Sequence, residues 1–416
     1  MMLAPRIGSL FSGAGGLDLA VEHVAGGRTV WHCEADPDAS RVLAAHWPGV
    51  PNLGDITAVD WSAVEPVDVL CGGFPCQDVS AAGRRAGIAS GTRSGLWLEY
   101  AEAINQLRPR LVVIENVRGL LSGYAHRAME PGPDDLGDRS SRPLLRAAGA
   151  VLGDLADLGY DAQWTTVAAS EVGAPHRRER VFIVAHPAGS GRPNQQKRGN
   201  APRFDVIAEP GAGDRDSARG ATAGIHQLER SARELAAVDL LPTPTASRYG
   251  SNQSPSPGVA VRPGLDSIAD LLPTPNASDA TGGGQTPDKR EGHSRQLIDY
   301  ALLNGTPQWG KYEPAIRRWE AITREAPTPT EPGARGNPRL AAAFSEWMMG
   351  WPIGWVTRVG ISHPERPGML KNGVARDHAT AALSRSAMLR IIGNGVVPQQ
   401  AVAALQWLLS VCEVAA

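Results

Sequence analysis

The sequence predicts an α/β fold with a doubly wound, mostly parallel sheet, followed by a second, smaller domain. Three observations lead to this prediction. Short apolar runs rich in β-branched residues alternate with helical patterns from Ile7 to about Ala185, polar or glycine-rich loops follow those runs, and the composition changes abruptly after His186. Regular alternation of strand and helix patterns is typical of crossover units in a parallel sheet.

Six runs are short, apolar and bounded by turn residues, so we expect them to be strands. They are Ile7–Phe11, Thr29–Cys33, Val67–Cys71, Leu111–Ile114, Gln163–Ala168 and Val181–Ala185. Four stretches between them carry apolar residues at helical spacing and predict helices: Leu17–Val24, Pro37–Trp47, Ser94–Leu107 and Leu144–Leu158. The polar stretch Tyr124–Arg142 is rich in Pro, Gly and Asp, which predicts a surface insertion.

The composition divides the 416 residues into three parts. We expect a first domain over residues 1–186, large enough for a catalytic core, a second, smaller domain with Pro/Thr-rich loops over 187–345, which leaves room for a recognition part, and a C-terminal segment over 346–416 whose helix Pro398–Val411 returns to the first domain. Within the middle part, Asp239–Ser247 recurs as Asp270–Ser278. Two copies are too few for a solenoid, so they are either a pair of similar turns or a repeated loop that faces DNA.

The charge and cysteine content limit the class of protein. A net charge of −2 gives no global basic field, so any nucleic-acid contact must come from local patches such as Arg177, Arg178 and Arg180. The four cysteines, Cys33, Cys71, Cys76 and Cys412, show no metal-binding spacing. With no apolar run of membrane-spanning length and no secretory leader, we expect reduced thiols in a cytoplasmic protein without metal or membrane contact.

One cysteine stands in a position suited to a nucleophile. Cys76 follows Gly72-Gly73-Phe74-Pro75, directly after an expected strand. Reactive groups in open α/β sheets lie at the carboxyl ends of strands, and Pro75 would stiffen the backbone that presents the thiol. The alternative is a buried cysteine that acts as a small hydrophobic residue.

The first loops predict an adenosine site. Phe11-Ser12-Gly13-Ala14-Gly15-Gly16 joins the first strand to a helix, where glycine allows a ligand to approach the backbone. Glu34 ends the second strand and could bind ribose hydroxyls. In the third loop, Asp55 could accept from an adenine amino group while Ile56 packs on the ring. Each acid taken alone is equally a loop residue or a helix cap.

Three further segments carry polar groups at element ends. Glu115 emerges from the expected strand Leu111–Ile114, where partial burial favours the protonated form; its alternative role is a helix cap. Strand alternation would aim Arg178 and Arg180 toward one face, unless they form an ordinary salt-bridged strand edge. Asn394, in Gly393-Asn394-Gly395-Val396, could reach a ligand from the turn before the last helix.

This ordered set of motifs resembles the bacterial and phage DNA (cytosine-5) methyltransferase family along almost the whole chain. The resemblance implies a Rossmann-like class I methyltransferase fold that binds S-adenosyl-L-methionine and releases S-adenosyl-L-homocysteine. The residues that it assigns to the cofactor are Phe11, Gly13, Gly15, Gly16, Glu34, Asp55, Ile56, Pro75, Leu96, Asn394 and Val396. Those that it assigns to catalysis are Cys76, Glu115, Arg178 and Arg180.

The resemblance also implies the mechanism. The Cys76 thiolate would attack C6 of a cytosine extruded from duplex DNA, Glu115 would hold or protonate N3, and Arg178 would contact O2. Residues of the segment from Gln77 to Arg93 would close over the base and contact the DNA backbone: Gln77, Ser80, Arg84, Arg85 and Arg93. We expect a monomer that acts on double-stranded DNA, with a restriction endonuclease as an associated partner in some systems.

Two features depart from the family pattern. His176 stands where the family usually has Gln, and the block before the last motif is reduced to Arg339-Leu340 with Glu346–Pro352. Two alternatives share the motifs: an RNA cytosine methyltransferase and a DNA-binding regulator that has lost activity. The RNA methylase class with two cysteines is less favoured, because the position expected to contact N3 carries Glu115.

Overall fold

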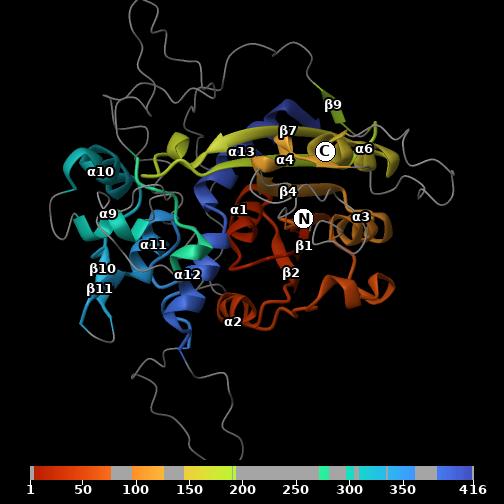
Figure 1. Cartoon of the computed structure of the whole chain (residues 1–416). Helices are drawn as coiled ribbons and strands as arrows, with labels where there is room; N and C mark the ends of the chain where they lie inside the picture. The colour runs from red at the N-terminus through yellow and green to blue at the C-terminus, as the bar shows by residue number, and fades with distance from the viewer. Residues whose placement is uncertain are drawn as a thin grey trace, which may run out of the picture.

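The computed structural model describes residues 4–75, 96–125, 145–189, 191–193, 271–280, 297–303, 309–333, 336–360 and 382–414. Figure 1 shows two adjoining regions: a sheet flanked by helices, and a group of helices built from the second half of the chain. No helix in the described part of the chain is long and apolar enough to cross a membrane. Within the same residues, no group of three or more His, Cys, Asp or Glu side chains could hold a metal ion.

The central sheet has six strands in the order β2-β1-β3-β4-β8-β7. The first four pair in parallel, whereas β8 is antiparallel to both β4 and β7. Their bounds are β1 Arg6–Leu10, β2 Arg28–Cys33, β3 Val69–Gly72, β4 Leu111–Val117, β7 Tyr160–Ala168 and β8 Glu179–Pro187. The expected doubly wound, mostly parallel sheet is therefore confirmed, with an antiparallel pair at one edge.

Helices cover both faces of this sheet. On one face, α1 (Gly16–Ala25) and α13 (Pro398–Val411) share an apolar core with β1, β3, β4 and β8. On the other face, α3 (Leu96–Leu107) and α6 (Ala147–Asp157) share a second core with the sheet. Helix α2 (Pro37–His46) is capped at its N-terminus by Asp36, whose carboxylate accepts from the amides of Asp38 and Ala39. The four helices expected in the first 186 residues are therefore all present.

A third core joins the second half of the chain to the glycine-rich loop. It contains Ala14 and Trp47 together with Trp319, Trp347 and further buried side chains from the later helices. Those helices are α9 (Leu297–Leu303), α10 (Glu313–Ile322), α11 (Ala342–Met348) and α12 (Arg385–Asn394). Figure 1 shows α12 running between this group and α2, so the later helices lie directly beside the carboxyl edge of the sheet.

Short elements complete the fold. The helix α4 is Gly119–Ser122, and the 3-10 helices are η1 Ile56–Ala58, η2 Trp61–Ala63, η4 Ala169–Val172, η5 Ala277–Ala280 and η7 Gly310–Tyr312. Three antiparallel pairs join β5 (Tyr124–Ala125) to β6 (Leu145–Arg146), β9 (Gly191–Pro193) to β12 (Cys412–Val414), and β10 (Thr330–Pro332) to β11 (Pro338–Leu340).

Candidate active site

The glycine-rich loop after β1 has the backbone that the sequence predicts. Phe11, Gly13 and Gly15 all have positive φ, at 53°, 56° and 80°. A side chain at such angles is strained, and Phe11 adopts them while its ring stacks on Tyr100. The Gly15 amide donates to the Ser12 carbonyl, at 2.9 Å, just before α1 begins at Gly16. The loop thus presents open backbone at the carboxyl end of β1.

Glu34 supports this loop from the end of β2. Its Oε2 accepts from the Gly13 amide at 2.7 Å, and its Oε1 accepts from the Asp36 amide at 2.7 Å. Burial raises the pKa of the Glu34 carboxyl, opposed by these two hydrogen bonds. A carboxylate has about four lone-pair positions, so two remain for a ligand. Glu34 therefore orients the loop and keeps acceptor capacity.

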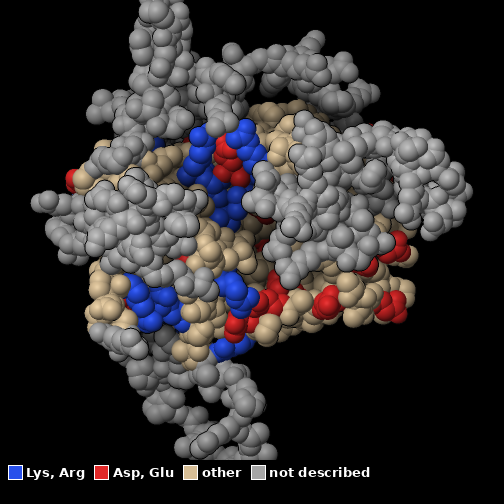
Figure 2. All heavy atoms as spheres, in the orientation of Figure 1, with Lys and Arg blue, Asp and Glu red and all other residues tan. Residues whose placement is uncertain are grey.

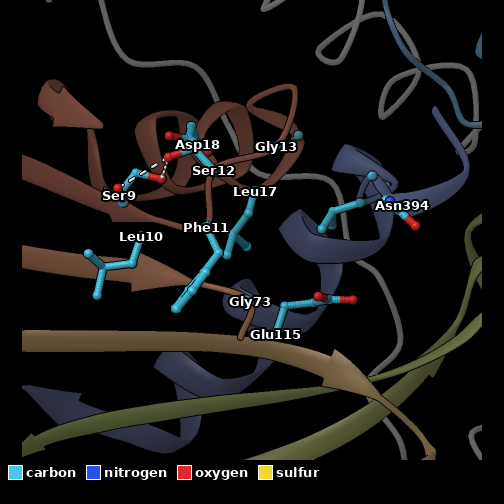
Figure 3. Close-up of a pocket in the computed structure, with 13 residues that line it drawn as sticks. Ser9, Leu10, Phe11, Ser12, Gly13, Leu17, Asp18, Gly73, Glu115 and Asn394 are labelled. Carbon is cyan, nitrogen blue, oxygen red and sulfur yellow. Dashed lines mark hydrogen bonds between the residues drawn. The ribbon is translucent and has the colours of Figure 1, made fainter. Parts of the chain in front are cut away.

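A pocket lies between the loops that follow β1, β3 and β4 and the turn after α12 (Figure 3). The space between these walls amounts to about 400 Å³ when the adjoining open solvent is included. Its lining residues are Ser9, Leu10, Phe11, Ser12, Gly13, Gly16, Leu17, Asp18, Gly73, Glu115, Asn394, Gly395 and Val396. Because β2 and β3 flank β1 on opposite sides, the pocket lies at the topological switch point, where open α/β sheets bind ligands.

The turn after α12 approaches the glycine loop closely. A Cβ on Gly16 would lie 2.6 Å from the Val396 carbonyl oxygen, so only glycine fits there. The Trp351 indole donates to the same carbonyl at 2.7 Å. The structure thus brings five predicted cofactor residues into one pocket: Phe11, Gly13, Gly16, Asn394 and Val396.

Glu115 joins this pocket from β4. Its carboxylate Oε1 lies 2.8 Å from the Arg180 Nε, and both side chains are largely buried. Burial raises the pKa of Glu115, and the charges of Arg180 and Arg178 oppose that rise. A Cβ on Gly73 would lie 2.9 Å from Glu115 Oε2, so the double glycine lets the carboxylate approach the loop that leads to Cys76. Figure 3 shows Glu115 beside Gly73.

Arg178 lies outside the strand within which side-chain alternation applies. It precedes β8, which begins at Glu179, and its φ of 30° breaks the extended backbone. Its buried guanidinium donates to the carbonyls of Pro275, Gly393 and Gly395 instead of turning to Glu115. Strand alternation therefore does not extend to Arg178, and Arg180 is the arginine that pairs with the Glu115 carboxylate.

The backbone before Cys76 is held in place. The Asn116 side-chain amide donates to the Phe74 carbonyl at 3.0 Å, and the Phe74 ring packs on Trp97. Pro75 is the last described residue of this loop. Cys76 lies outside the described residues, as do the expected DNA contacts Gln77, Ser80, Arg84, Arg85 and Arg93.

The other cysteines described with side chains are unsuited to nucleophilic attack. Cys33 and Cys71 are both buried. Burial raises the pKa of Cys33 to about 12 and that of Cys71 well above its ordinary value. Thiols in such surroundings stay protonated and unreactive.

Six predicted cofactor residues do not line the pocket: Gly15, Glu34, Asp55, Ile56, Pro75 and Leu96. The Asp55 carboxylate caps η1 by accepting from the Thr57 amide and hydroxyl at 3.0 and 2.9 Å, which is the alternative that the sequence left open. Ile56 is buried in the core beneath α3, and Leu96 opens α3. Pro75, which follows Phe74, also stands outside the pocket lining, and Gly15 caps α1.

A cluster of three charged side chains forms around Glu179, which is next to Arg180 in the sequence. Glu179 pairs with Arg118 at 2.5 Å and with Arg177 at 2.8 Å, and both arginines are about half exposed. Their charges and hydrogen bonds outweigh burial and lower the pKa of Glu179. Figure 2 shows Lys and Arg side chains gathered around an acidic group beside a hollow on the viewed face.

Sequence reasoning missed several supporting residues. The Trp355 indole donates to the Ala14 carbonyl at 2.8 Å, and its ring stacks on His46 at 3.5 Å. Trp351 holds Val396 as described above. The three tryptophans within Trp347–Trp355 were the available signal, but nothing local indicates which loop they contact. His176, the departure from the family pattern, is buried with its Nε2 3.0 Å from the Met348 carbonyl.

Comparison with known proteins agrees with these motifs. The family described as C-5 cytosine-specific DNA methylase matches residues 6–209. The type II methyltransferase M.AquIA of Picosynechococcus sp. is 33% identical over 190 residues, which cover 44% of this chain and 71% of the relative. M.HpaII of Haemophilus parainfluenzae, also a type II methyltransferase, is 35% identical over 185 residues, or 44% of this chain and 46% of that protein.

Among solved structures, the Dnmt2 methyltransferase of S. pombe superposes with a TM-score of 0.49 and 14% identity, covering 98% of both chains. The family match over residues 6–209 spans the six-stranded sheet and the glycine-rich loop. The chain belongs to the C-5 cytosine-specific DNA methylase family.

Proposed function

We propose that the chain is a DNA (cytosine-5) methyltransferase that uses S-adenosyl-L-methionine to methylate C5 of a flipped cytosine in a specific duplex sequence. The observation that supports this most strongly is one pocket that joins the glycine-rich loop to Glu115. A cofactor loop and a buried acid in contact with the same space are what a group transfer to a bound base requires. Membership in the C-5 cytosine-specific DNA methylase family supports the same methyl transfer to cytosine.

The pocket suits S-adenosyl-L-methionine. The positive φ of Gly13 and the contact of Gly16 with Val396 leave exposed backbone that a ligand can approach. Glu34 keeps free acceptor positions for ribose hydroxyls, and Asn394 offers a side-chain amide from the opposite wall. When bound, the cofactor supplies an electrophilic methyl group. Asp55 remains a proposed adenine contact, since its hydrogen bonds to Thr57 use only Oδ1, and Ile56, next to it in the sequence, remains proposed with it.

Cytosine C5 is a weak nucleophile, so the base needs activation. We assign this to the Cys76 thiolate, which bonds to C6 and converts C5 into an enamine carbon. After C5 is methylated, a base removes its proton, the C5–C6 double bond reforms, and the thiolate leaves. The position of Cys76 two residues after Phe74, whose carbonyl Asn116 holds, would fix where the thiolate meets the base.

Glu115 supports the addition step at N3. Negative charge builds on the ring as the thiolate adds, and a protonated carboxyl can donate to N3 to neutralise it. Burial holds the pKa of Glu115 above its ordinary value, which favours that protonated form. Arg180, 2.8 Å from the carboxylate, would contact O2 of the same base. This replaces the sequence-based assignment of O2 to Arg178.

The DNA contacts and domain limits remain proposals. We assign target recognition to residues 187–345, with base flipping assisted by Gln77, Ser80, Arg84, Arg85 and Arg93. The relatives are named type II methyltransferases, so a restriction endonuclease with the same target would be the matching partner. We propose that the protein acts as a monomer.

The test is methyl transfer by the purified protein. The protein is incubated with tritiated S-adenosyl-L-methionine and either duplex DNA of mixed sequence or transcribed tRNA, and the digested nucleosides are separated. Label in 5-methyldeoxycytidine supports the proposal. Label in 5-methylcytidine from tRNA alone would support the RNA alternative, and cofactor binding without label in either would support the inactive regulator.

A further inference from the structure

Arg178 joins three segments that are far apart in the sequence. Its guanidinium donates to the Pro275 carbonyl at 3.2 Å, and a second nitrogen donates to Gly393 at 3.1 Å and Gly395 at 2.5 Å. The residue is only 5% exposed. Removing a guanidinium from water is costly unless its donors are satisfied, so this contact has a structural purpose that a surface arginine would not have.

The backbone of Arg178 is fixed as well. Its amide donates to the Thr274 hydroxyl at 3.2 Å, and its carbonyl accepts from the Gln400 side chain at 2.7 Å. The positive φ of Arg178 is a strained conformation for a residue with a side chain. Strain of this kind persists where surrounding contacts determine it, and here they come from α13 and from the segment 271–280.

The segment 271–280 lies between Arg178 and the end of α12. A Cβ on Gly393 would lie 2.2 Å from the Asn276 carbonyl carbon and the Ala277 amide nitrogen. The two backbones therefore touch, and no side chain separates them. On its other side, the Leu272 amide donates to the Pro175 carbonyl at 2.8 Å. Any shift of this segment must move the end of α12 or break the Arg178 contacts.

The end of α12 leads directly into the pocket wall. Asn394, Gly395 and Val396 line the pocket, and the Arg178 guanidinium holds the carbonyl of Gly395. The segment 271–280 belongs to the proposed recognition region 187–345. One guanidinium thus contacts both the cofactor side of the pocket and a part of the region assigned to DNA recognition.

We propose that Arg178 is a positioning residue that couples the cofactor turn Gly393–Val396 to the segment 271–280, so that occupation of the pocket orders this segment. The inference rests on the proposed function. Whichever of the two ligands binds second then meets a segment 271–280 that the first ligand has already ordered. The cofactor and DNA therefore strengthen the binding of each other. The planar fork of arginine reaches three carbonyls at once, which the single ammonium of lysine does not do.

The repeat in the sequence gains a physical explanation from this contact. In the second copy, the Leu-Pro-Thr-Pro run supplies the Leu272 amide, the Thr274 hydroxyl and the Pro275 carbonyl to the segment Pro175–Arg178, which precedes β8. The residues that recur are therefore the ones that make the contact. The first copy lies outside the described residues.

The experiment measures hydrogen exchange of the full-length protein with and without S-adenosyl-L-homocysteine, read by mass spectrometry on peptides that cover 271–280. Titration calorimetry gives the ligand affinity of each variant. In the wild type, the ligand is expected to slow exchange in 271–280, although this segment does not line the pocket. In Arg178→Lys, we expect several-fold weaker binding and loss of that protection.

Two further variants keep the test decisive. Arg108→Lys is the control, because Arg108 also has a positive φ and donates to the carbonyl of Leu158, which is far from the pocket. In this variant the ligand should still slow exchange in 271–280. Thr274→Val removes only the hydroxyl that accepts from the Arg178 amide. This variant replaces Arg178→Lys in the test if the lysine variant does not fold. It should weaken the protection of 271–280 by the ligand.

The outcomes separate the two claims. A wild type that does not bind S-adenosyl-L-homocysteine overturns the proposed function, and the coupling with it. A wild type that binds the ligand without slower exchange in 271–280 overturns the coupling alone. Full protection in a folded Arg178→Lys variant also overturns it, as does full protection in Thr274→Val if the lysine variant is unfolded.

Discussion

The Arg180 Nε lies 2.8 Å from the Glu115 Oε1, across the antiparallel pair β4 and β8. The pairing register places Val117 of β4 opposite Arg180 of β8. The Arg180 side chain therefore extends along β4 past two residues to reach the Glu115 carboxylate. The pair lies at the carboxyl end of β4, beside the loop that leads to Cys76. It provides an acid and a fixed positive charge in the same water-poor space, where electrostatic interactions are stronger than in water.

Glu115→Gln should lower kcat by roughly 10²- to 10⁴-fold, the usual contribution of a positioned general acid. Glutamine keeps the size of the side chain, so circular dichroism and cofactor affinity should stay near those of the wild type. The matched control is Glu102→Gln, because Glu102 is exposed on α3 and bonds only to Gln106 among the described contacts. Near-normal turnover in Glu115→Gln would reject the N3 role.

Arg180→Lys should lower kcat while leaving the affinity for S-adenosyl-L-homocysteine close to that of the wild type. Its guanidinium touches Glu115 and the Glu179 carbonyl, and it makes none of the cofactor-turn contacts of Arg178. Single-turnover kinetics and titration calorimetry would separate the two effects. Equal loss of cofactor affinity in the Arg178 and Arg180 variants would contradict the division of roles between them.

Arg118 and Arg177 should contact phosphates beside the flipped base. Neutralising both in Arg118→Gln/Arg177→Gln should reduce the slope of log K against log salt by about 2, since each phosphate contact contributes roughly 0.9. Glu179→Gln should raise non-specific DNA affinity, because Glu179 competes with phosphate for both arginines. Fluorescence anisotropy over a range of salt concentrations measures this, and an unchanged slope would exclude the contact.

Gly393→Ala should destabilise the fold and weaken cofactor binding. The added methyl would overlap the Asn276 and Ala277 backbone at 2.2 Å, and such overpacking costs typically about 1–3 kcal/mol. Gly149→Ala is the control: Gly149 lies in α6 with nothing within 4 Å of an added Cβ, so alanine should stabilise the helix by roughly 0.5–1 kcal/mol. Thermal unfolding of both variants would show opposite shifts, and shifts of the same sign would refute the packing argument.

His176 should make the protein lose stability in acid. Burial lowers the pKa of His176 to about 3 in the folded chain, whereas in the unfolded chain it is about 6.5. Between these values the unfolded chain binds the extra proton, so stability falls as pH drops, by up to about 1.4 kcal/mol per pH unit. His176→Gln can keep the donor to Met348 without the titration, and its unfolding free energy should depend less on pH from 6.5 to 4. An identical pH dependence would contradict this.

The sheet, the glycine-rich loop and Glu115 could be predicted because the sequence patterns that indicate them are local. The six strand runs, the glycine loop and Glu115 depend on neighbouring residues and on the rule that loops gather at the carboxyl ends of strands. The positions of Phe11, Gly13 and Gly16 follow from the same rule.

The contacts of Arg178 could not be predicted from the sequence, and the two alternatives for Asp55 could not be separated, for different physical reasons. Strand alternation holds only within a strand, and Arg178 precedes β8 with a φ of 30°. Its partners, Pro275 and Gly393, are 97 and 215 residues away along the chain. Asp55 has a partner only two residues away, so a cap and a ligand contact share the same local pattern.

The exchange of residues 187–345 with those of a relative should change the methylated sequence, because we assign base recognition to this region. The junctions should preserve Arg178 and the turn Gly393–Val396, which hold the segment 271–280 in this chain. Sequencing of methylated sites in the exchanged protein measures the outcome. An unchanged target would refute the domain assignment.

The most direct test of the account is methylation sequencing of plasmid DNA from cells that express either the wild type or Cys76→Ala. The account predicts 5-methylcytosine at one sequence in the wild-type sample and at none in the variant sample, while the purified variant still binds S-adenosyl-L-homocysteine. Methylation that persists in Cys76→Ala would contradict the assigned nucleophile. A wild type that binds the cofactor and leaves plasmid cytosines unmodified would contradict the proposed activity on DNA.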